Sequence, residues 1–217
     1  MQLRSAVVRI HTRRGNLAEA TRPAAWALEK ARDSARAPLL AQALPVAAVL
    51  RLAGGDAAGA LAILAEFERT QHVRTEANLA ANLPAAVRTA IDAGDPDLAG
   101  RLTEIVEPIY PLHLHAMTTA RALLREHAGS HEEAADLFAD AARRWERFGM
   151  PWERAQALLG QARCFVASGR VADAAEPIRE ARKIFATLDA APAVAVADDL
   201  LAAGTAATSP QDRAPGR

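Results

Sequence analysis

Glycine recurs at similar spacings along most of the chain. Gly15, Gly55, Gly94, Gly129 and Gly169 stand 40, 39, 35 and 40 residues apart. Five residues after each glycine comes an alanine, at Ala20, Ala60, Ala99, Ala134 and Ala174. Glycine tolerates the left-handed backbone that ends a helix, and alanine lets two helices approach closely. This register predicts an array of similar helical units rather than one globular core.

Small or apolar residues hold equivalent places around each glycine. Nine residues after it come Ala24, Leu64, Thr103, Phe138 and Ile178, and twelve after it come Ala27, Phe67, Val106, Ala141 and Ala181. Seven residues before it come Val8, Ala48, Val87, Ala122 and Ala162. The positions five, nine and twelve after the glycine share one helix face. Each unit is therefore predicted to be a helix, a tight turn and a second helix, which together bury their apolar stripe against neighbouring units in one continuous seam.

The register predicts five helix pairs and a final single helix. The expected pairs are 2–13 with 17–33, 38–53 with 57–71, 76–93 with 97–107, 113–127 with 131–148, and 152–167 with 171–187. The segment after Pro192 is expected to cover the end of the array and to turn Asp198 and Asp199 to water. We expect a repeat domain over 1–203 and a disordered tail over 204–217. The first helix begins almost at Met1, which indicates either a longer ancestor or an end that packs on a partner or on another copy.

Residues beside the glycines predict where second helices begin. Asn16 with Glu19 and Ser130 with Glu133 match the capping-box pattern, in which both side chains bond backbone amides. Asp56 and Asp95 are further N-cap candidates. Pro23 and Pro177 fall at the same place inside two second helices, where each removes a backbone hydrogen bond.

Composition excludes several classes of protein. The 217 residues are 51% hydrophobic but only 4% aromatic, with 26 basic and 26 acidic side chains. This balance gives no electrostatic argument for binding nucleic acid or an anionic membrane. The longest apolar stretch, 37–50, is shorter than the roughly 20 residues that span a bilayer. The single cysteine, Cys164, precludes an internal disulfide and fits a reducing, cytoplasmic compartment.

The repeat resembles the tetratricopeptide repeat (TPR). Its signature positions in the last unit are occupied by Leu158, Ala162, Phe165, Gly169, Ala174, Ile178 and Ala181. His11, Arg51, Ala90 and Arg125 stand where that motif prefers tyrosine. The run "WERFGMPWERAQALLGQARCFVASGRVADAAEPIREARKIFATLDAAP" is similar to C-terminal repeat regions of bacterial signalling proteins that carry an ATPase with a cyclase or a LuxR-type DNA-binding module. The resemblance implies an all-α, TPR-like α-solenoid of about five repeats with a C-terminal capping helix.

A search for chemistry finds no catalytic constellation. The glycines at Gly54 and Gly55 lack the lysine and hydroxyl residue of a phosphate-binding loop and are interpreted as an interhelix turn. His113 and His115, even with His127 and His131, lack the further ligands of a metal site. Cys164 is interpreted as a core residue, and Glu132 with Glu133 as charges that suit a helix N-terminus. We expect no enzyme activity, no cofactor and no metal.

Two binding regions are predicted. Arg9, Val49, Arg88, Leu123 and Arg163 occupy one position of the five first helices, which line the concave side of such arrays. Alternating guanidinium and aliphatic groups would suit a peptide with acidic and apolar side chains. The competing interpretation is that these arginines are solvated or paired within the array. Tyr110, Trp145 and Trp152 are the second region, either a ligand pocket or filling between repeats.

These features leave three functions open. The first is a non-catalytic scaffold that binds a protein partner through a peptide or helix in its groove. The second is a module that senses a small-molecule effector, as the resemblance implies for LuxR-type or cyclase-type regulators. The third is a detached C-terminal part of a larger ATP-binding regulator. Neither nucleic acid nor a membrane is expected as a partner.

Overall fold

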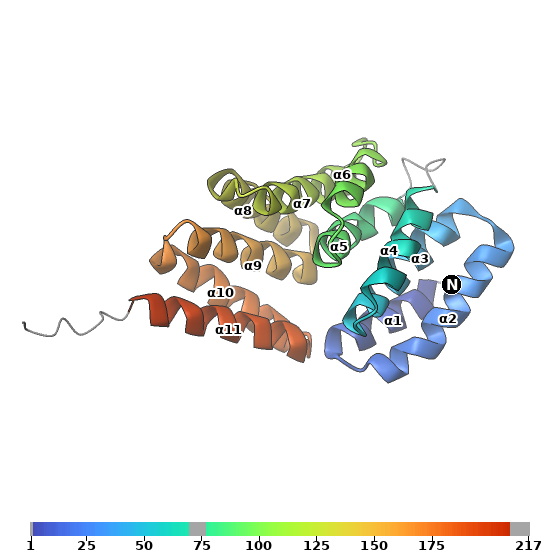
Figure 1. Ribbon diagram of the computed structural model, residues 1–217, viewed down its shortest axis with the longest axis horizontal. Helices are drawn as coiled ribbons and strands as arrows, with labels where there is room; N and C mark the ends of the chain where they lie inside the picture. The colour runs from blue at the N-terminus through green and yellow to red at the C-terminus, as the bar shows by residue number, and fades with distance from the viewer. Residues whose placement is uncertain (1, 70–76, 209–217) are drawn as a thin grey trace, which may run out of the picture.

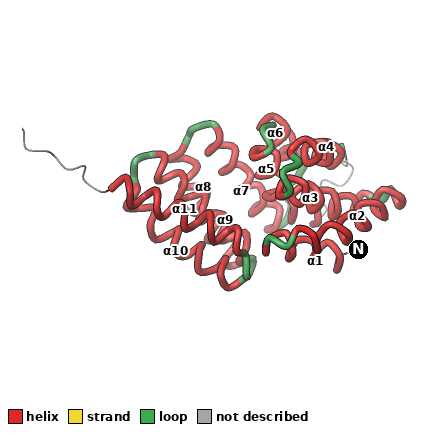
Figure 2. Tube along the Cα trace, turned by 60° about the horizontal axis from the view of Figure 1, so that its bottom comes forward, coloured by secondary structure: helices red, strands yellow, loops and turns green. Residues whose placement is uncertain are grey.

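The computed structural model describes residues 2–69 and 77–208, and this part of the chain is helical without strands (Figures 1 and 2). The helices are α1 Gln2–Arg14, α2 Leu17–Ser34, α3 Ala37–Ala53, α4 Ala57–Glu68, α5 Ala77–Asp92, α6 Pro96–Glu104, α7 Pro111–His127, α8 His131–Phe148, α9 Pro151–Ala167, α10 Val171–Thr187 and α11 Ala191–Thr208. The predicted all-α, TPR-like α-solenoid of five helix pairs with a final helix is confirmed.

The helices form two layers. Each odd-numbered helix from α1 to α9 pairs with the helix that follows it, and the contacts α1–α3, α3–α5, α5–α7 and α7–α9 join the pairs along one layer. The even-numbered helices form the second layer, and α11 packs on α10. The predicted first helices of the units therefore share one surface, as the groove hypothesis requires.

The predicted glycine register is confirmed in the backbone. Gly15, Gly55, Gly94, Gly129 and Gly169 have φ between 74° and 92°. In each turn the amide after the glycine donates to the carbonyl five residues earlier, over 2.8 to 3.0 Å, in the bonds Asn16–His11, Asp56–Arg51, Asp95–Ala90, Ser130–Arg125 and Arg170–Phe165. Left-handed glycine with this bond is the Schellman ending of a helix. The position at which the TPR motif prefers tyrosine thus supplies the backbone carbonyl that accepts this bond in every unit, although none of the five residues there is tyrosine.

Two of the four predicted N-caps form. Asp56 Oδ1 accepts from Gly59 N, and Asp95 Oδ1 accepts from Leu98 N, both at 2.8 Å. The capping boxes at Asn16 and Ser130 are wrong, because neither side chain bonds an amide of the following helix. Instead, Glu133 Oε1 lies 3.1 Å from Arg125 Nε across the turn and forms an ion pair with it.

The core consists of one long cluster of buried side chains and two small clusters at the N-terminal end of the array. The five alanines of the repeat are 0 or 1% exposed, and the main cluster of buried side chains runs from α3 to α11. The first pair contributes two small clusters of alanine and valine instead, around Ala20 and Ala31. The predicted continuous seam therefore holds for the last four pairs. The buried alanines and valine of α1 and α2 do not belong to the main cluster, and the partly buried Leu28 of α2 packs against it.

Some helix ends differ from the predicted ones. α6 ends at Glu104 rather than 107, because Pro108 disfavours helical backbone at Glu107. The end predicted at 71 for the fourth helix lies outside the described residues. α11 continues to Thr208, past the predicted domain end at 203, and Gly204 is buried beside Val171. The predicted tail from 209 onward lies outside the described residues, and Pro23 and Pro177 lie inside α2 and α10 as predicted.

The two ends of the array meet. α1 contacts α11, Arg14 Nη2 lies 2.9 Å from Asp189 Oδ2, and a Cβ built on Gly15 would lie 3.1 Å from Pro192 Cγ. Figure 1 shows the N-terminal helices and α11 approaching each other at the lower edge. These contacts lie at the C-terminal end of α1, so the expectation that the open end of the array packs on a partner or on another copy stays a prediction. Leu3 and Ile10 on α1 stay exposed.

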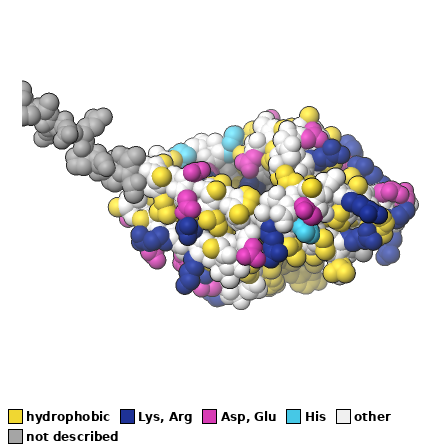
Figure 3. All heavy atoms as spheres, turned by 90° about the horizontal axis from the view of Figure 1, so that it is seen from below, with side chains coloured by type: hydrophobic (Ala, Val, Ile, Leu, Met, Phe, Trp, Pro, Cys, Tyr) yellow, Lys and Arg dark blue, Asp and Glu magenta, His cyan; other side chains and the backbone are white. Residues whose placement is uncertain are grey.

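The surface carries charges of both signs. Basic and acidic side chains are interspersed on the face shown in Figure 3, in line with the equal numbers of each in the sequence. Within 2–69 and 77–208, no helix combines the length and the apolar character that a bilayer span demands.

Candidate functional site

A groove runs along the layer of odd-numbered helices. Its first part, the N-terminal pocket, has a volume of about 260 Å³ and is lined from α1, α3, α5 and α9. Its second part, the central pocket, has a volume of about 340 Å³ and is lined from α5, α7 and α9. Arg88 and Asp92 belong to both pockets, so the two parts adjoin.

The structure brings the predicted stripe together in this groove. Arg9, Val49 and Arg88 line the N-terminal pocket, and Arg88, Leu123 and Arg163 line the central pocket. Leu123 is only 4% exposed and forms part of the pocket floor. The five positions therefore share one surface, and their role in binding stays a prediction.

The central pocket neutralises its own charge. Arg163 donates from Nε and Nη2 to the two carboxylate oxygens of Glu126, over 2.6 and 2.8 Å. Burial is the largest single influence and lowers the pKa of Arg163, but the hydrogen bonds to Glu126 together with the attraction of nearby negative charges raise that pKa overall. For Arg163 the interpretation as an arginine paired within the array is therefore right.

A buried carboxylate lies beside the arginines of the N-terminal pocket. Glu153, in the first turn of α9, is 3% exposed, with Oε1 3.8 Å from Arg13 Nη2 and Oε2 3.9 Å from Arg88 Nη2. Oε2 accepts no hydrogen bond from the described residues. Both distances exceed hydrogen-bond length, so Glu153 balances charge without saturating the donors of either arginine.

Burial lowers the pKa of the three arginines of this pocket, because it disfavours their charged form. It lowers the pKa of Arg13 to about 10, with Glu153 opposing the shift. It also lowers the pKa of Arg9 and Arg88 against the same opposition from Glu153. Three guanidinium groups are thus held close together with one buried counterion.

Trp152 closes the pocket from the far end of the array. The guanidinium of Arg13 lies over its indole ring, 4.2 Å from the centroid, and the ring packs on Phe185 at 5.3 Å. Because Arg13 is on α1 and Trp152 on α9, this contact joins the first and fifth pairs. The pocket exists because the array curves back on itself.

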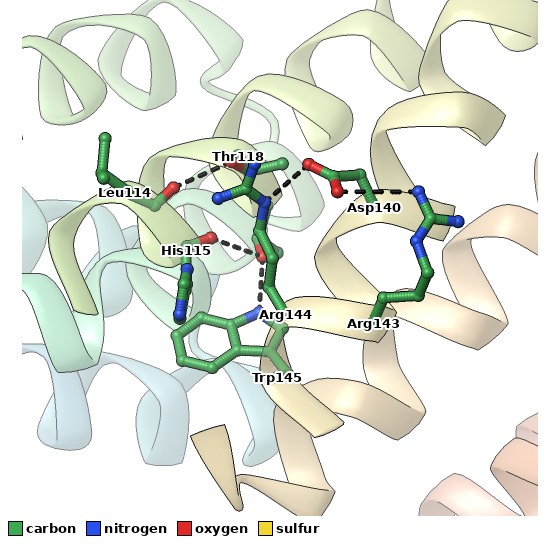
Figure 4. A network of polar contacts seen from close by, with 8 residues as sticks. Leu114, His115, Thr118, Asp140, Arg143, Arg144 and Trp145 are labelled. Atoms are coloured by element: carbon green, nitrogen blue, oxygen red, sulfur yellow. Dashed lines mark hydrogen bonds and ion pairs between the residues drawn. The ribbon is translucent and has the colours of Figure 1, made fainter. Parts of the chain in front are cut away.

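Tyr110, Trp145 and Trp152, which were predicted to share a ligand pocket, do not line either of the two pockets of the groove together. Trp145 is 1% exposed, its Nε1 donates to Thr119 Oγ1 at 2.8 Å, and the His115 ring lies near its ring at an interplanar angle of 80° (Figure 4). Tyr110 is 58% exposed before α7 and lies beside His113. Of the three, Trp152 alone lines one of these pockets, and Trp145 fills the space between α7 and α8 instead.

The other candidates of the sequence have structural places. His113 is buried, and its Nδ1 accepts from the amide of Tyr110 at 3.2 Å. No group of three His, Cys, Asp or Glu side chains in the described ranges could hold a metal ion. Burial raises the pKa of Cys164 to about 12, which confirms it as a core thiol. Gly54 and Gly55 lie in the turn between α3 and α4 as predicted.

The sequence reasoning missed Arg13 and Glu153. Glu153, Ala157, Gly160 and Cys164 share one face of α9, and the last three are buried. A carboxylate in an apolar stripe of this kind signals a buried counterion. Arg13 gives no such signal, because only the curvature of the array brings it to Glu153.

Comparison with known proteins adds one structural likeness. No protein-family model matches the chain, and no curated protein matches it. Among solved structures, the chain is similar to the crystal structure of a variant of a Podosopora anserina putative kinesin light chain with nearly identical TPR-like repeats. The TM-score is 0.48 and the identity 18%, over 85% of this chain and 93% of that one.

Proposed function

We propose that the chain is a non-catalytic scaffold that binds a peptide or a helix of a partner protein in the groove. The supporting observation is that one groove along α1, α3, α5, α7 and α9 holds all five residues of the predicted stripe. Repeat arrays of this kind present extended concave surfaces that suit elongated ligands.

The side chains of the groove favour a peptide that is both apolar and acidic. Val46, Val49 and Leu52 give the N-terminal pocket an apolar wall, and Arg9 and Arg13 add positive charge beside it. Arg9 forms no hydrogen bond or ion pair with another described residue, so its guanidinium is free for a carboxylate. Within the described part of the groove, the carboxylates of Asp92 and Glu126 lie among the arginines Arg88 and Arg163.

The test is selection of peptides from a random displayed library on the immobilised chain. Selected peptides are then measured by calorimetry against Arg9→Glu and Val49→Asp, which change half-buried residues that line the groove without breaking an ion pair. Arg4→Glu is the matched control on α1, since Arg4 lies over Trp26 and outside the groove. We expect at least tenfold weaker binding to the two groove variants and unchanged binding to the control. Equal affinity for all of them would show that the N-terminal part of the groove is not the binding surface for these peptides.

A small-molecule effector is the second candidate ligand. It is favoured by the N-terminal pocket, which combines an apolar wall with convergent polar groups, as ligand sites do. The sensing site is thus moved from Tyr110 and Trp145 to the pocket beside Trp152. A small molecule that raises the melting temperature of the chain supports this function. If none of the selected peptides competes with that molecule, its binding is distinct from peptide binding.

The cellular context is proposed from the sequence resemblance. We propose a cytoplasmic regulatory module of bacterial signalling or transcription, either separate or derived as the C-terminal part of an ATP-binding regulator. Genes beside the reading frame are the direct check. A neighbouring ATPase gene of this regulator class supports the proposal, and neighbours that are unrelated to signalling across several genomes speak against it.

A further inference from the structure

The N-terminal pocket has more positive than negative charge. Arg9, Arg13 and Arg88 contribute three positive charges, while Asp92 on the rim and Glu153 beneath contribute two negative ones, which leaves a net charge of +1. The adjoining central pocket differs, because Glu126 already holds Arg163 through two hydrogen bonds. The unbalanced charge is therefore confined to one end of the groove.

The guanidinium groups of this pocket form no hydrogen bonds with residues 2–69 or 77–208. Arg13 and Arg88 reach Glu153 only at 3.8 and 3.9 Å, and Arg9 forms no hydrogen bond or ion pair with any described residue. Guanidinium donors that face a pocket and meet no protein acceptor at hydrogen-bond distance favour a ligand that accepts hydrogen bonds and carries negative charge. One anion between the three arginines would supply both.

The remainder of the pocket is apolar. Pro45, Val46, Val49 and Leu52 line it from α3, and Trp152 closes it from α9. A small inorganic anion would leave this wall facing water. A ligand with an apolar body beside its charged group covers the wall and gains hydrophobic stabilisation as well.

We propose that the N-terminal pocket recognises a single carboxylate carried on an apolar body, with the carboxylate between Arg9, Arg13 and Arg88 and the body against Val49 and Trp152. This proposal rests on the proposed binding role of the groove, and it names the chemical group that the N-terminal pocket recognises. Two sources share this chemistry: a free carboxylic acid, and a glutamate flanked by apolar residues in a peptide.

The net charge selects a carboxylate over a phosphate group. A carboxylate has one negative charge, which equals the surplus of the pocket, and its two oxygens match the fork of a guanidinium. A phosphate dianion would leave an uncompensated charge beside Glu153. Because the ligand contacts α1, α3, α5 and α9, it also ties the two ends of the array together and stabilises the folded chain.

The experiment uses matched pairs of charged and neutral probes on the full chain. In the first arm, benzoate, 3-phenylpropionate and octanoate are each compared with their amides by thermal shift and calorimetry. In the second arm, the blocked peptide acetyl-Leu-Glu-Leu-amide is compared with its glutamine counterpart. Inorganic phosphate is the probe for charge without an apolar body.

We expect at least one acid or the glutamate peptide to bind about tenfold or more tightly than its neutral partner. Arg9→Gln, which removes a guanidinium that no described residue pairs with, should abolish this difference, and Arg4→Gln on the same helix should retain it. The arm that responds identifies the source of the carboxylate. If Arg9→Gln without ligand has the same melting temperature as Arg4→Gln, misfolding cannot explain the loss of the affinity difference between the charged and neutral probes.

Three results would overturn the inference: no charge-dependent binding in any pair up to millimolar concentration, unchanged preference in Arg9→Gln, or phosphate binding as tight as that of the best acid. Failure here is distinguishable from failure of the scaffold function. Selected peptides that depend on Leu123 and the central pocket, but not on Arg9, would uphold the scaffold and refute the carboxylate site.

Discussion

Gly160 tests how tightly adjacent helix pairs are packed. It lies on α9, where a Cβ added to it would be 2.6, 2.7 and 2.8 Å from the Cζ, Cε1 and Cε2 atoms of Phe138 on α8. Phe138 is 1% exposed, so its ring cannot swing into solvent. The Gly160→Ala substitution therefore places a methyl group inside the contact distance of a confined ring.

The expected effect is the balance of two opposing contributions. Overpacking of a confined core site costs about 1–3 kcal/mol. Replacing glycine by alanine within a helix returns about 0.5–1 kcal/mol. We expect Gly160→Ala to lower the free energy of unfolding by about 1 kcal/mol. Gly100 on α6 is the matched control, because its added Cβ meets no atom within 4 Å, and Gly100→Ala should stabilise by about 0.5–1 kcal/mol.

Urea unfolding followed by circular dichroism measures both variants. The double variant Gly160→Ala with Phe138→Leu separates crowding from other causes, because the smaller side chain makes room for the methyl group. It should be more stable than the sum of the two single effects predicts, by about 1 kcal/mol. The reasoning is refuted if Gly160→Ala is as stable as Gly100→Ala, or if the two substitutions simply add.

Other consequences concern charge, ionisation and helix ends. Glu153→Gln leaves three half-buried arginines without their shared buried counterion, so unfolding in urea should show a loss of roughly 1–3 kcal/mol, and a variant as stable as the wild type would contradict the proposed charge balance. The pKa of Cys164 in the folded chain, about 12, lies above its ordinary value of 9.0, so the contribution of the neutral thiol to stability is complete below pH 9 and is lost between pH 9 and 12. The free energy of unfolding of the wild type should therefore fall more steeply over that pH range than that of Cys164→Ala. Equal slopes for the two proteins would argue against burial of the thiol. Asp95→Ala should cost about 1 kcal/mol by removing an N-cap bond, whereas Ser130→Ala should cost almost nothing, and equal losses in thermal unfolding would restore the capping box at Ser130.

The local part of the fold is predictable from the sequence because it depends on short-range rules. Glycine at φ near 80° ends the first helix of each pair, and an alanine five residues later packs against it, so both appear as a period in the sequence. The N-caps show the limit of such rules. Asn16 and Asp95 are both good capping residues, but only the Asp95 side chain reaches an amide of the next helix. Residue type alone does not determine side-chain orientation.

The site is only half predictable for a different reason. Arg9, Val49 and Arg88 repeat in register, so the sequence places them on one surface. Contacts between Arg13, Glu153 and Trp152 join residues from the first and fifth pairs, and they depend on the summed curvature of the whole array. No local pattern encodes this sum. Aromatic residues mislead for a related reason, since Trp145 and Trp152 lie seven residues apart in sequence, one in the core and one in the groove.

Closure of the array is the claim on which the N-terminal pocket depends. A cysteine pair at Arg14→Cys and Ala191→Cys tests it directly, because Gly15 and Pro192 are in contact and both neighbouring positions are exposed. Cys164 does not compete, since its thiol is buried with a raised pKa. With a short bismaleimide reagent and peptide mapping, we predict an efficient intramolecular cross-link between α1 and α11, and little in the control pair Arg14→Cys with Arg143→Cys. Cross-linking of the first pair no greater than that of the control would contradict closure and remove the basis for the pocket.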